Sequence, residues 1–336
     1  MPERRLHRYI ALVRTMACVR YGDDWESKGD DCRLMCIRDI MLLALSLGGL
    51  ATGVLWPAFG LLITPWTVQL LMVQLFFSFL GVDFQTLARL RPDDALEVGV
   101  ISAVKLFILP VLLWAICAWL APGLALSVLL LSGVSTGVTA PFIATLLGVS
   151  PNRMLQVAVL TSALVPLTLP ALVSLLLGQH LEIPYSHMAL LLAVIMLPPG
   201  ILVFLLKRFS PRLALQMERL SVPVGLPLLF FTSLAIIAPF AKQVTGQIDR
   251  VLISLGLATL LAVIFVACGL GISHVWPRRI DGLSAALGLT CINNVLVAVF
   301  AARFFGSDPT LLAVLYMFPY FLILLPMRWM AQRLKR

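Results

Sequence analysis

The chain alternates between long apolar runs and short polar connections, and ten of the runs are long enough to cross a lipid bilayer. A membrane-spanning helix needs roughly 20 apolar residues. The predicted spans are residues 40–58, 65–82, 95–120, 124–147, 154–178, 187–207, 219–240, 249–275, 282–305 and 308–330. Connections such as residues 121–125 are too short to hold a domain outside the membrane. Almost the whole chain is therefore predicted to lie in the bilayer.

The ten predicted spans divide into two halves of five, residues 40–178 and residues 187–330. Because five is an odd number, the second half enters the membrane with the opposite orientation. The fourth span of each half carries polar residues inside an apolar run, "GVSTGVTAPFIATLLG" from residue 133 and "GLTCINNVLVAVFAARFFG" from residue 288. Matching interruptions of this kind occur in the inverted repeats of secondary transporters. The pattern predicts an all-α polytopic membrane protein with ten transmembrane helices in two inverted five-helix repeats.

The polar stretches in the fourth and ninth spans predict that both helices break inside the membrane. Proline lacks the amide proton that a helix uses and clashes with the preceding turn. Freed backbone groups are tolerated at membrane depth only where they are buried in protein or line a wet cavity. An ordinary kink, in which nearby hydroxyl groups bond the freed carbonyls, is the alternative. The predicted helix-breaking residues are Gly133, Gly137, Pro141 and Gly288.

Composition also indicates a membrane protein. Of the 336 residues, 60% are hydrophobic and 12% are charged, and the mean hydropathy is +1.00, whereas a soluble domain carries about 25% charged residues. The net charge of +9 does not indicate nucleic-acid binding, because the basic residues lie in short connections and form no stripe. Residues 1–39 mix charges and lack the apolar segment of a cleavable signal peptide. Met35 is an alternative start of the natural product.

The Lys and Arg residues predict the orientation in the membrane. With residues 1–39 inside, 21 of the 25 lie on the side of that tail, and only Lys242, Arg250 and Arg303 lie on the other. Cytoplasmic connections carry the excess of Lys and Arg. Both the N-terminal tail and the C-terminus, residues 331–336, are therefore predicted to be cytoplasmic. We expect an integral, multi-pass protein of a bacterial inner (plasma) membrane, and the oligomeric state stays open.

One charged residue, Lys105, lies inside a span, within "GVISAVKLFILP" at residues 99–110. At about 1.5 Å per residue, it lies roughly 15 Å into the third span, near the depth of Asn293 and of the break in the fourth. Charges at this depth usually face a cavity or the bundle interior and mark function. Two alternatives are that Lys105 extends to an interface or pairs with Glu97, from which about 12 Å of helix rise separates it.

Together these features resemble the bile acid:sodium symporter family. The resemblance is carried by "FFSFLGVDF" at the end of the second span, "GVISAVKLFILPVLLWAICAWL" in the third, the glycine and threonine stretch of the fourth and the Asn293–Asn294 pair of the ninth. It covers about residues 40–330. It implies a panel domain of spans 1, 2, 6 and 7 and a core domain of spans 3 to 5 and 8 to 10. Broken helices 4 and 9 would cross at the site, and one domain would rock against the other.

The chain departs from this family at the sodium sites. In the fourth span "GVTAPF" stands where the family has Gly-Gly-Thr-Ala-Ser-Asn, and in the ninth Gly288 and Ile292 stand where the family has Glu and Gln. Lys105 stands where the family has a glutamine that ligates sodium, so its ammonium group would replace a bound cation. The resemblance implies a coupling or residual ion site at Lys105, Ser135, Thr161 and Ser162.

We therefore expect a secondary transporter of a small organic anion, a carboxylate or a bile-acid-like anion, that works by alternating access without sodium. No metal or other cofactor is expected; sodium is disfavoured, and a proton on Lys105 is a candidate coupling ion. The anion would also meet the amide ends of the broken helices, which favour negative charge. The expected substrate-binding residues are Lys105, Thr136, Thr139, Thr290, Asn293 and Asn294.

Three alternative functions stay open. The first is sodium-coupled symport of an organic anion. The second is arsenite efflux, because arsenite carriers share this architecture, with Cys291 as the candidate ligand. The third is a membrane sensor without transport, although residues 1–39 are short for an output domain. An enzyme is not expected, because no nucleophile and base or metal-binding set lies within the spans. The expected partners are the anion and the lipid bilayer, and no nucleic acid.

Overall fold

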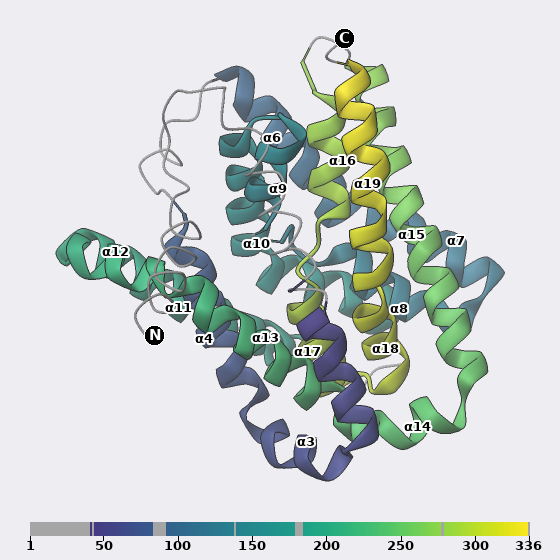
Figure 1. The fold of residues 1–336 in the computed structure, drawn as a ribbon. Helices are drawn as coiled ribbons and strands as arrows, with labels where there is room; N and C mark the ends of the chain where they lie inside the picture. The colour runs from purple at the N-terminus through teal and green to yellow at the C-terminus, as the bar shows by residue number, and fades with distance from the viewer. Residues whose placement is uncertain are drawn as a thin grey trace, which may run out of the picture.

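The fold is helical, as a computed structural model of the chain shows (Figure 1). The structure describes residues 41, 44–82, 92–137, 139–178, 184–276 and 279–334. The predicted N-terminal tail and the last two residues of the predicted C-terminus lie outside this part of the chain. Within it, extended backbone pairs only at one isolated bridge, between Thr136 and Ile292.

Prolines stand at the start of several helices. The amide protons of the first turn have no acceptor within the helix, so proline, which lacks one, is tolerated there. The helices are α3 (Pro57–Ile63), α4 (Thr67–Leu80), α6 (Pro92–Ala103), α7 (Leu109–Leu120), α8 (Pro122–Gly133), α9 (Ala140–Leu147), α10 (Pro151–Leu177), α11 (Tyr185–Phe209), α12 (Pro211–Arg219), α13 (Ser221–Ile237), α14 (Ala241–Gly246), α15 (Ile248–Val275), α16 (Gly282–Thr290), α17 (Asn294–Phe304), α18 (Ser307–Leu315) and α19 (Met317–Leu334). A further helix at Ala44–Leu55 precedes α3.

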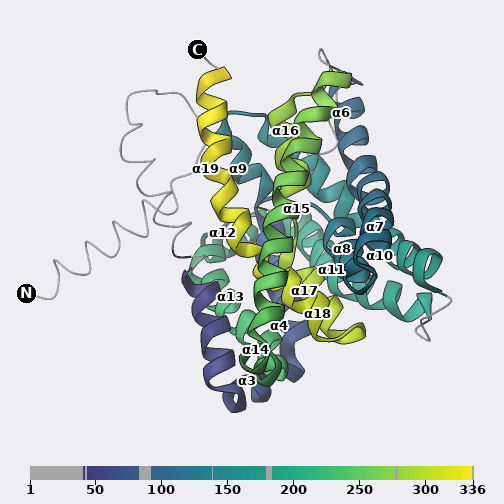
Figure 2. The same ribbon diagram turned by 90° about the vertical axis from the view of Figure 1, so that its right-hand side faces the viewer.

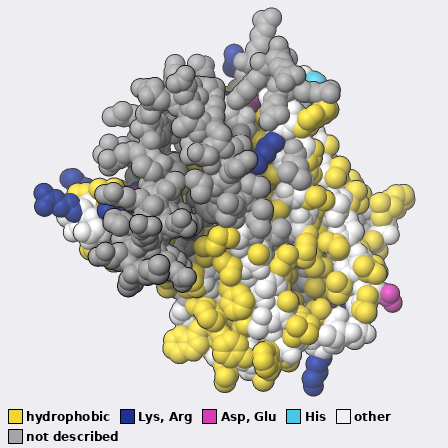
Figure 3. Space-filling model, in the orientation of Figure 1, with side chains coloured by type: hydrophobic (Ala, Val, Ile, Leu, Met, Phe, Trp, Pro, Cys, Tyr) yellow, Lys and Arg dark blue, Asp and Glu magenta, His cyan; other side chains and the backbone are white. Residues whose placement is uncertain are grey.

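Seven segments of the described chain are long and apolar enough to cross a membrane. They are Pro57–Leu80, Asp94–Leu120, Pro151–Leu177, Tyr185–Phe209, Pro223–Gly246, Ile248–Val275 and Ser307–Ala331. Where the sequence predicts the other three spans, the structure has the shorter apolar helices Ala44–Leu55, α8 and α17. Hydrophobic side chains cover much of the visible surface (Figure 3), as expected where protein meets lipid. The fold is that of a polytopic helical membrane protein.

The helices pack in two groups. In the first group, at the lower left of Figure 1, α4 packs against α11 and α13, and α13 also packs against α3. In the second, α15 packs along α16, α18 and α19, while α10 packs against α6, α8 and α9; Figure 2 shows α15 and α16 from the side. The groups meet where α10 lies against α11 and where α17 contacts α4, α11 and α13. Helix α17, the second half of the predicted ninth span, therefore lies at this boundary.

Candidate functional site

Two interrupted helices meet in the interior of the protein. The first interruption separates the end of α8 at Gly133 from the start of α9 at Ala140, and the second separates α16 from α17 at residues 291–293. Their extended segments pair in antiparallel fashion. The Gly137 amide donates to the Cys291 carbonyl at 2.9 Å, and the Asn293 amide donates to the Ser135 carbonyl at 3.0 Å. Each segment therefore satisfies backbone groups that the other leaves free. We call residues 134–137, 139 and 290–294 the crossing.

Of the predicted helix-breaking residues, Gly137 lies in the first interruption and Gly133 lies directly before it. A Cβ atom on Gly137 would lie 2.9 Å from the Ile292 carbonyl oxygen, so only glycine lets the two segments approach this closely. Gly133 is the last residue of α8.

The structure corrects the predicted positions of Pro141 and Gly288. Pro141 is the second residue of α9, where its missing amide proton costs nothing, so it begins the second half-helix and does not break the first. Helix α16 does not break at Gly288 but continues to Thr290. A Cβ atom on Gly288 would lie 2.8 Å from a side-chain methyl carbon of Ile101. This glycine therefore allows α16 to pack closely on α6.

The carbonyl groups at the broken end of α16 all have donors. The last carbonyls of a helix lack partners within the helix, and here side chains from three other elements supply them. The donors are the Thr136 hydroxyl to Gly288 at 2.8 Å, the Lys105 ammonium to Leu289 at 2.7 Å and the Tyr316 hydroxyl to Thr290 at 2.9 Å. The next carbonyl, of Cys291, accepts from the Gly137 amide. The backbone groups at this broken helix end are therefore satisfied by donors from the protein itself.

Lys105 lies in a π-helical turn, Val104–Ile108, that interrupts the long helix formed by α6 and α7. Pro110 explains the turn, because it has no amide proton to donate to the carbonyl of Leu106, four residues earlier. The helix widens before this proline, and the Leu109 amide donates to the carbonyl of Val104, five residues back. Such wide turns occur often at functional sites. The turn carries Lys105 toward α16 and not toward lipid.

The Lys105 side chain is fully buried. Its Nζ atom lies 4.9 Å from the centre of the Phe265 ring, on α15, in addition to its bond with the Leu289 carbonyl. A cation suits both positions, because a helix C-terminus carries partial negative charge and the face of an aromatic ring attracts cations. Lys105 therefore does not extend to an interface.

Glu97, the other candidate partner of Lys105, pairs with Arg153 instead. The Glu97 carboxylate is buried, and Arg153 also lies 3.6 Å from Asp94. These contacts join the start of α6 to the start of α10. The charge of Lys105 consequently meets the Leu289 carbonyl and the face of the Phe265 ring and not this carboxylate.

The remaining predicted residues take different positions around the crossing. The Thr161 hydroxyl accepts the Thr136 amide at 3.0 Å and donates to the Val157 carbonyl, so it holds the first interruption on α10. Thr139 is exposed, with its hydroxyl 3.3 Å from that of Tyr320. The Asn293 side chain caps α17 by accepting the Leu296 amide at 3.3 Å.

Three buried oxygen atoms at the crossing have no hydrogen-bond partner among the described residues: Ser135 Oγ, Thr290 Oγ1 and Asn294 Oδ1. Ser135 and Thr290 are fully buried and Asn294 is nearly so. Buried polar atoms are nearly always paired with protein, water or a ligand. These three atoms are therefore available to a ligand, an ion or water.

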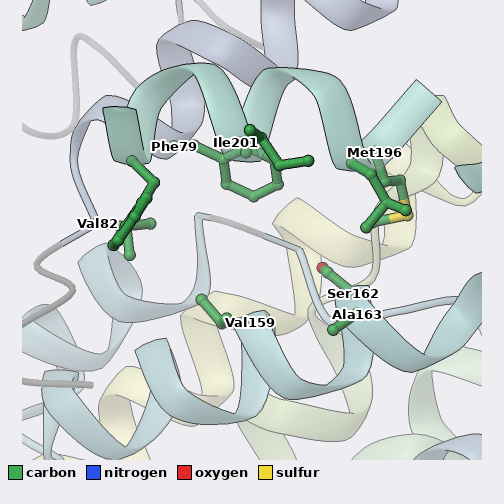
Figure 4. A pocket seen from close by; sticks show the side chains of 10 residues that line it. Phe79, Val82, Val159, Ser162, Ala163, Met196 and Ile201 are labelled. Carbon is green, nitrogen blue, oxygen red and sulfur yellow. The ribbon is translucent and has the colours of Figure 1, made fainter. Parts of the chain in front are cut away.

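A cavity of about 250 Å³ lies between α10 and the first helix group. Figure 4 shows Phe79, Ile201 and Met196 on one side and Val159 and Ser162 on the other, with the Ser162 hydroxyl pointing into the space. Ser162 follows Thr161, which bonds the first interruption. The lining of the cavity is thus apolar except for Ser162, and the residue before Ser162 contacts the crossing.

Sequence reasoning missed the part played by two aromatic residues and one backbone group. Phe265 stands in an apolar run with no polar neighbour that would single it out, and Tyr316 is one of several aromatic residues in the chain. Which carbonyl Lys105 binds depends on how α16 packs, which the sequence does not display.

Within the described ranges, no three His, Cys, Asp or Glu side chains come together in a way that could hold a metal ion. No protein-family model matches this chain, and no curated protein sequence matches it either.

Proposed function

We propose that this chain is a secondary transporter that carries a small organic anion across the membrane by alternating access, without sodium. The observation that carries the proposal is the crossing of two interrupted helices with the buried ammonium group of Lys105 against one of their ends. Discontinuous helices of this kind hold substrate and coupling ions in secondary transporters. We place the chain, on the resemblance described above, as a divergent relative of the bile acid:sodium symporter family.

Ten transmembrane helices in two inverted repeats are part of the proposal. Counted from the helix at Ala44–Leu55, the interrupted helices α8/α9 and α16/α17 are fourth and ninth, and the long proline-containing segments α10 and α18/α19 follow them. The first helix group would be the panel domain and the second the core domain. Rocking of one group against the other would open the cavity between α4, α10 and α11 to each side in turn. Both termini would face the cytoplasm.

Lys105 would act as a fixed cation. Its ammonium group binds a carbonyl at a helix end, as a bound metal cation would, and its side chain is buried against the Phe265 ring. It would therefore attract an anion through its charge, without direct contact. Because the charge is covalently attached, no sodium ion would have to enter with each substrate molecule.

The substrate carboxylate would bind at the N-terminal ends of α9 and α17, where free amides and the helix dipole favour negative charge. Exposed Thr139 and the amide side chains of Asn293 and Asn294 stand at these ends. The apolar cavity beside Ser162 would hold the rest of the molecule. Thr136 and Thr290 would contribute by shaping the crossing.

Sodium-coupled symport is the second candidate, favoured by the three unpartnered oxygen atoms of Ser135, Thr290 and Asn294. Hard cations such as sodium bind oxygen ligands, and such atoms in one region could supply them. The fixed charge of Lys105 argues against this candidate, because a second cation close to it would be repelled.

Transport can be tested with purified protein in proteoliposomes. Short mono- and dicarboxylates and a bile acid would first be screened by thermal shift, and uptake of a stabilising, radiolabelled anion then measured in sodium and in potassium buffers. We expect uptake in both, loss of uptake in Lys105→Gln, and normal uptake in Lys242→Gln, which makes the same change at an exposed lysine of α14. A requirement for a sodium gradient would select the second candidate, and an absence of flux for every stabilising anion would refute transport.

A further inference from the structure

Helix α12 (Pro211–Arg219) is short and carries three charged side chains in nine residues, those of Arg212, Glu218 and Arg219. Only Ser210 separates it from α11, whose segment Tyr185–Phe209 is long and apolar enough to cross a membrane, so α12 would start near the surface of the bilayer. Its buried residue is Ala214, on the side that packs against α4, α11 and α13. In Figure 1 it forms the left edge of the molecule. A short amphipathic helix in this position would lie in the membrane interface.

The outward side of α12 is basic. Arg212 and Arg219 are spaced seven residues apart and so share one face of the helix, while Arg208 precedes it at the end of α11. All three side chains are exposed, and none forms an ion pair with an acidic side chain in the described part of the chain. Figure 3 shows dark-blue side chains at this edge beside hydrophobic ones. The charge of this surface therefore needs a partner outside the chain.

Exposed apolar side chains lie among these arginines. Phe209 is 77% exposed, Leu215 is 51% exposed and Leu213 is 42% exposed. Arginine mixed with Phe and Leu on a short amphipathic helix suits the boundary between headgroups and acyl chains, where the rings and methyl groups enter the lipid and the guanidinium groups meet phosphates. A soluble anionic partner would satisfy the arginines but would leave the apolar side chains in water.

We propose that Arg208, Arg212 and Arg219 bind the headgroups of anionic phospholipids and fix α12 to the membrane surface. The charge distribution of the chain predicts that this end is cytoplasmic, where anionic lipids attract basic segments close to the membrane. The partner is a lipid surface of negative charge. Anchoring would hold the first helix group in place at the bilayer surface while the second group moves. The lipid contact itself does not depend on the transport proposal.

The test measures lipid binding to the full-length protein in detergent by native mass spectrometry, with phosphatidylglycerol and phosphatidylcholine as probes. We expect the natural protein to prefer phosphatidylglycerol and the preference to weaken with added salt. The variant Arg208→Gln/Arg212→Gln/Arg219→Gln should bind phosphatidylglycerol about a hundredfold more weakly, since each basic residue near the surface contributes about a fivefold effect.

Two controls make the result specific. Lys242→Gln/Arg250→Gln/Arg303→Gln removes three basic side chains at the predicted opposite end of the protein and should keep the preference. Arg208→Lys/Arg212→Lys/Arg219→Lys keeps the charge and should retain most of the binding. The proposal is overturned if the glutamine variant keeps the lipid preference, if both glutamine variants lose it equally, or if inorganic phosphate at the same concentration displaces the lipid. Because the readout is lipid binding, failure here would leave uptake unaffected.

Discussion

The two interruptions at the crossing differ in how their ends are held. At the end of α16, three side chains from different elements donate to successive carbonyls, and one of them carries a charge. At the end of α8, the Ser132 hydroxyl bonds back to the Val128 carbonyl within its own helix, and the Ser135 hydroxyl has no partner in the described chain. The second interruption is thus sealed by tertiary contacts, while the first depends mainly on the other segment and on Thr161.

This difference suggests a division of labour between the two interruptions. The sealed one holds the permanent charge of Lys105 at a fixed place through paired backbone carbonyls, although the side-chain oxygen atoms of Thr290 and Asn294 beside it have no partner in the described chain. The less constrained one leads into exposed Thr139 and lies on α10, one residue from the cavity at Ser162. We infer that the second interruption sets the electrostatic field and that the first adjusts to the substrate.

The largest effect is expected for Lys105→Met, which keeps the length of the side chain but removes its charge. The Leu289 carbonyl would lose its donor, and we expect the free energy of unfolding to fall by about 2 to 3 kcal/mol. Uptake should also fall, by about a hundredfold if the charge contributes about 2.8 kcal/mol to binding of the anion, since every 1.4 kcal/mol corresponds to a factor of about ten. Thermal unfolding and proteoliposome uptake measure the two effects. Lys242→Met on α14 is the matched control, and normal uptake by Lys105→Met would show that the charge plays no part in transport.

The next largest effect is expected for Gly137→Ala. Its added methyl group would push the two paired segments apart, whereas Lys105→Met removes a donor from one of them. The added methyl group would lie 2.9 Å from the Ile292 carbonyl oxygen, which belongs to the backbone and cannot rotate away. We expect a loss of about 1 to 3 kcal/mol in unfolding free energy. The comparison is Gly288→Ala, whose methyl group would meet the end of an Ile101 side chain at 2.8 Å. A larger loss of melting temperature for Gly288→Ala would contradict the importance of the backbone pairing.

The sequence is enough to predict the interruptions, because they come from local chemistry. Each run concentrates glycine and polar residues within a few positions, with a proline in one case, and both runs do break. The exact ends were less predictable. Pro141 fits the first turn of a helix as well as it fits a break, and Gly288 is as useful for close packing as for ending a helix. Local sequence does not distinguish these two uses of the same residue.

The partner of Lys105 could not be predicted from the sequence, for a different reason. The bond to Leu289 spans 184 positions and depends on the π-helical turn and on the packing of α15 against α16. An apolar residue offers its backbone carbonyl at any position, so no side chain marks Leu289 as the acceptor. Depth in the membrane indicated that Lys105 faces the interior, but only the fold determines which helix end it meets.

A third, smaller effect is expected for Tyr316→Phe, which removes one neutral donor from the sealed interruption. The Thr290 carbonyl would lose its bond of 2.9 Å in a buried place, at a cost of about 1 to 2 kcal/mol. Tyr320→Phe is the paired variant, because the Tyr320 hydroxyl contacts the Cys291 thiol and the hydroxyl of exposed Thr139, neither of which is a helix-end carbonyl. Differential scanning fluorimetry should show the larger decrease for Tyr316→Phe. Equal decreases would mean that capping of α16 is not what distinguishes this interruption.

Ser162→Ala is expected to change stability least. It also distinguishes the roles of the two interruptions most clearly. Its hydroxyl points into the cavity, so its removal should change the unfolding free energy by less than about 0.5 kcal/mol. If the first interruption and the adjoining cavity form the adjustable side of the site, the variant should alter the KM of uptake several-fold or change which anions stabilise the protein. Thr161→Val, one residue earlier, should instead lower stability, because the Thr136 amide would lose its acceptor. A Ser162→Ala variant with the substrate profile and KM of the natural protein would place the anion elsewhere, since the cavity would then have lost its one hydroxyl without any consequence for binding.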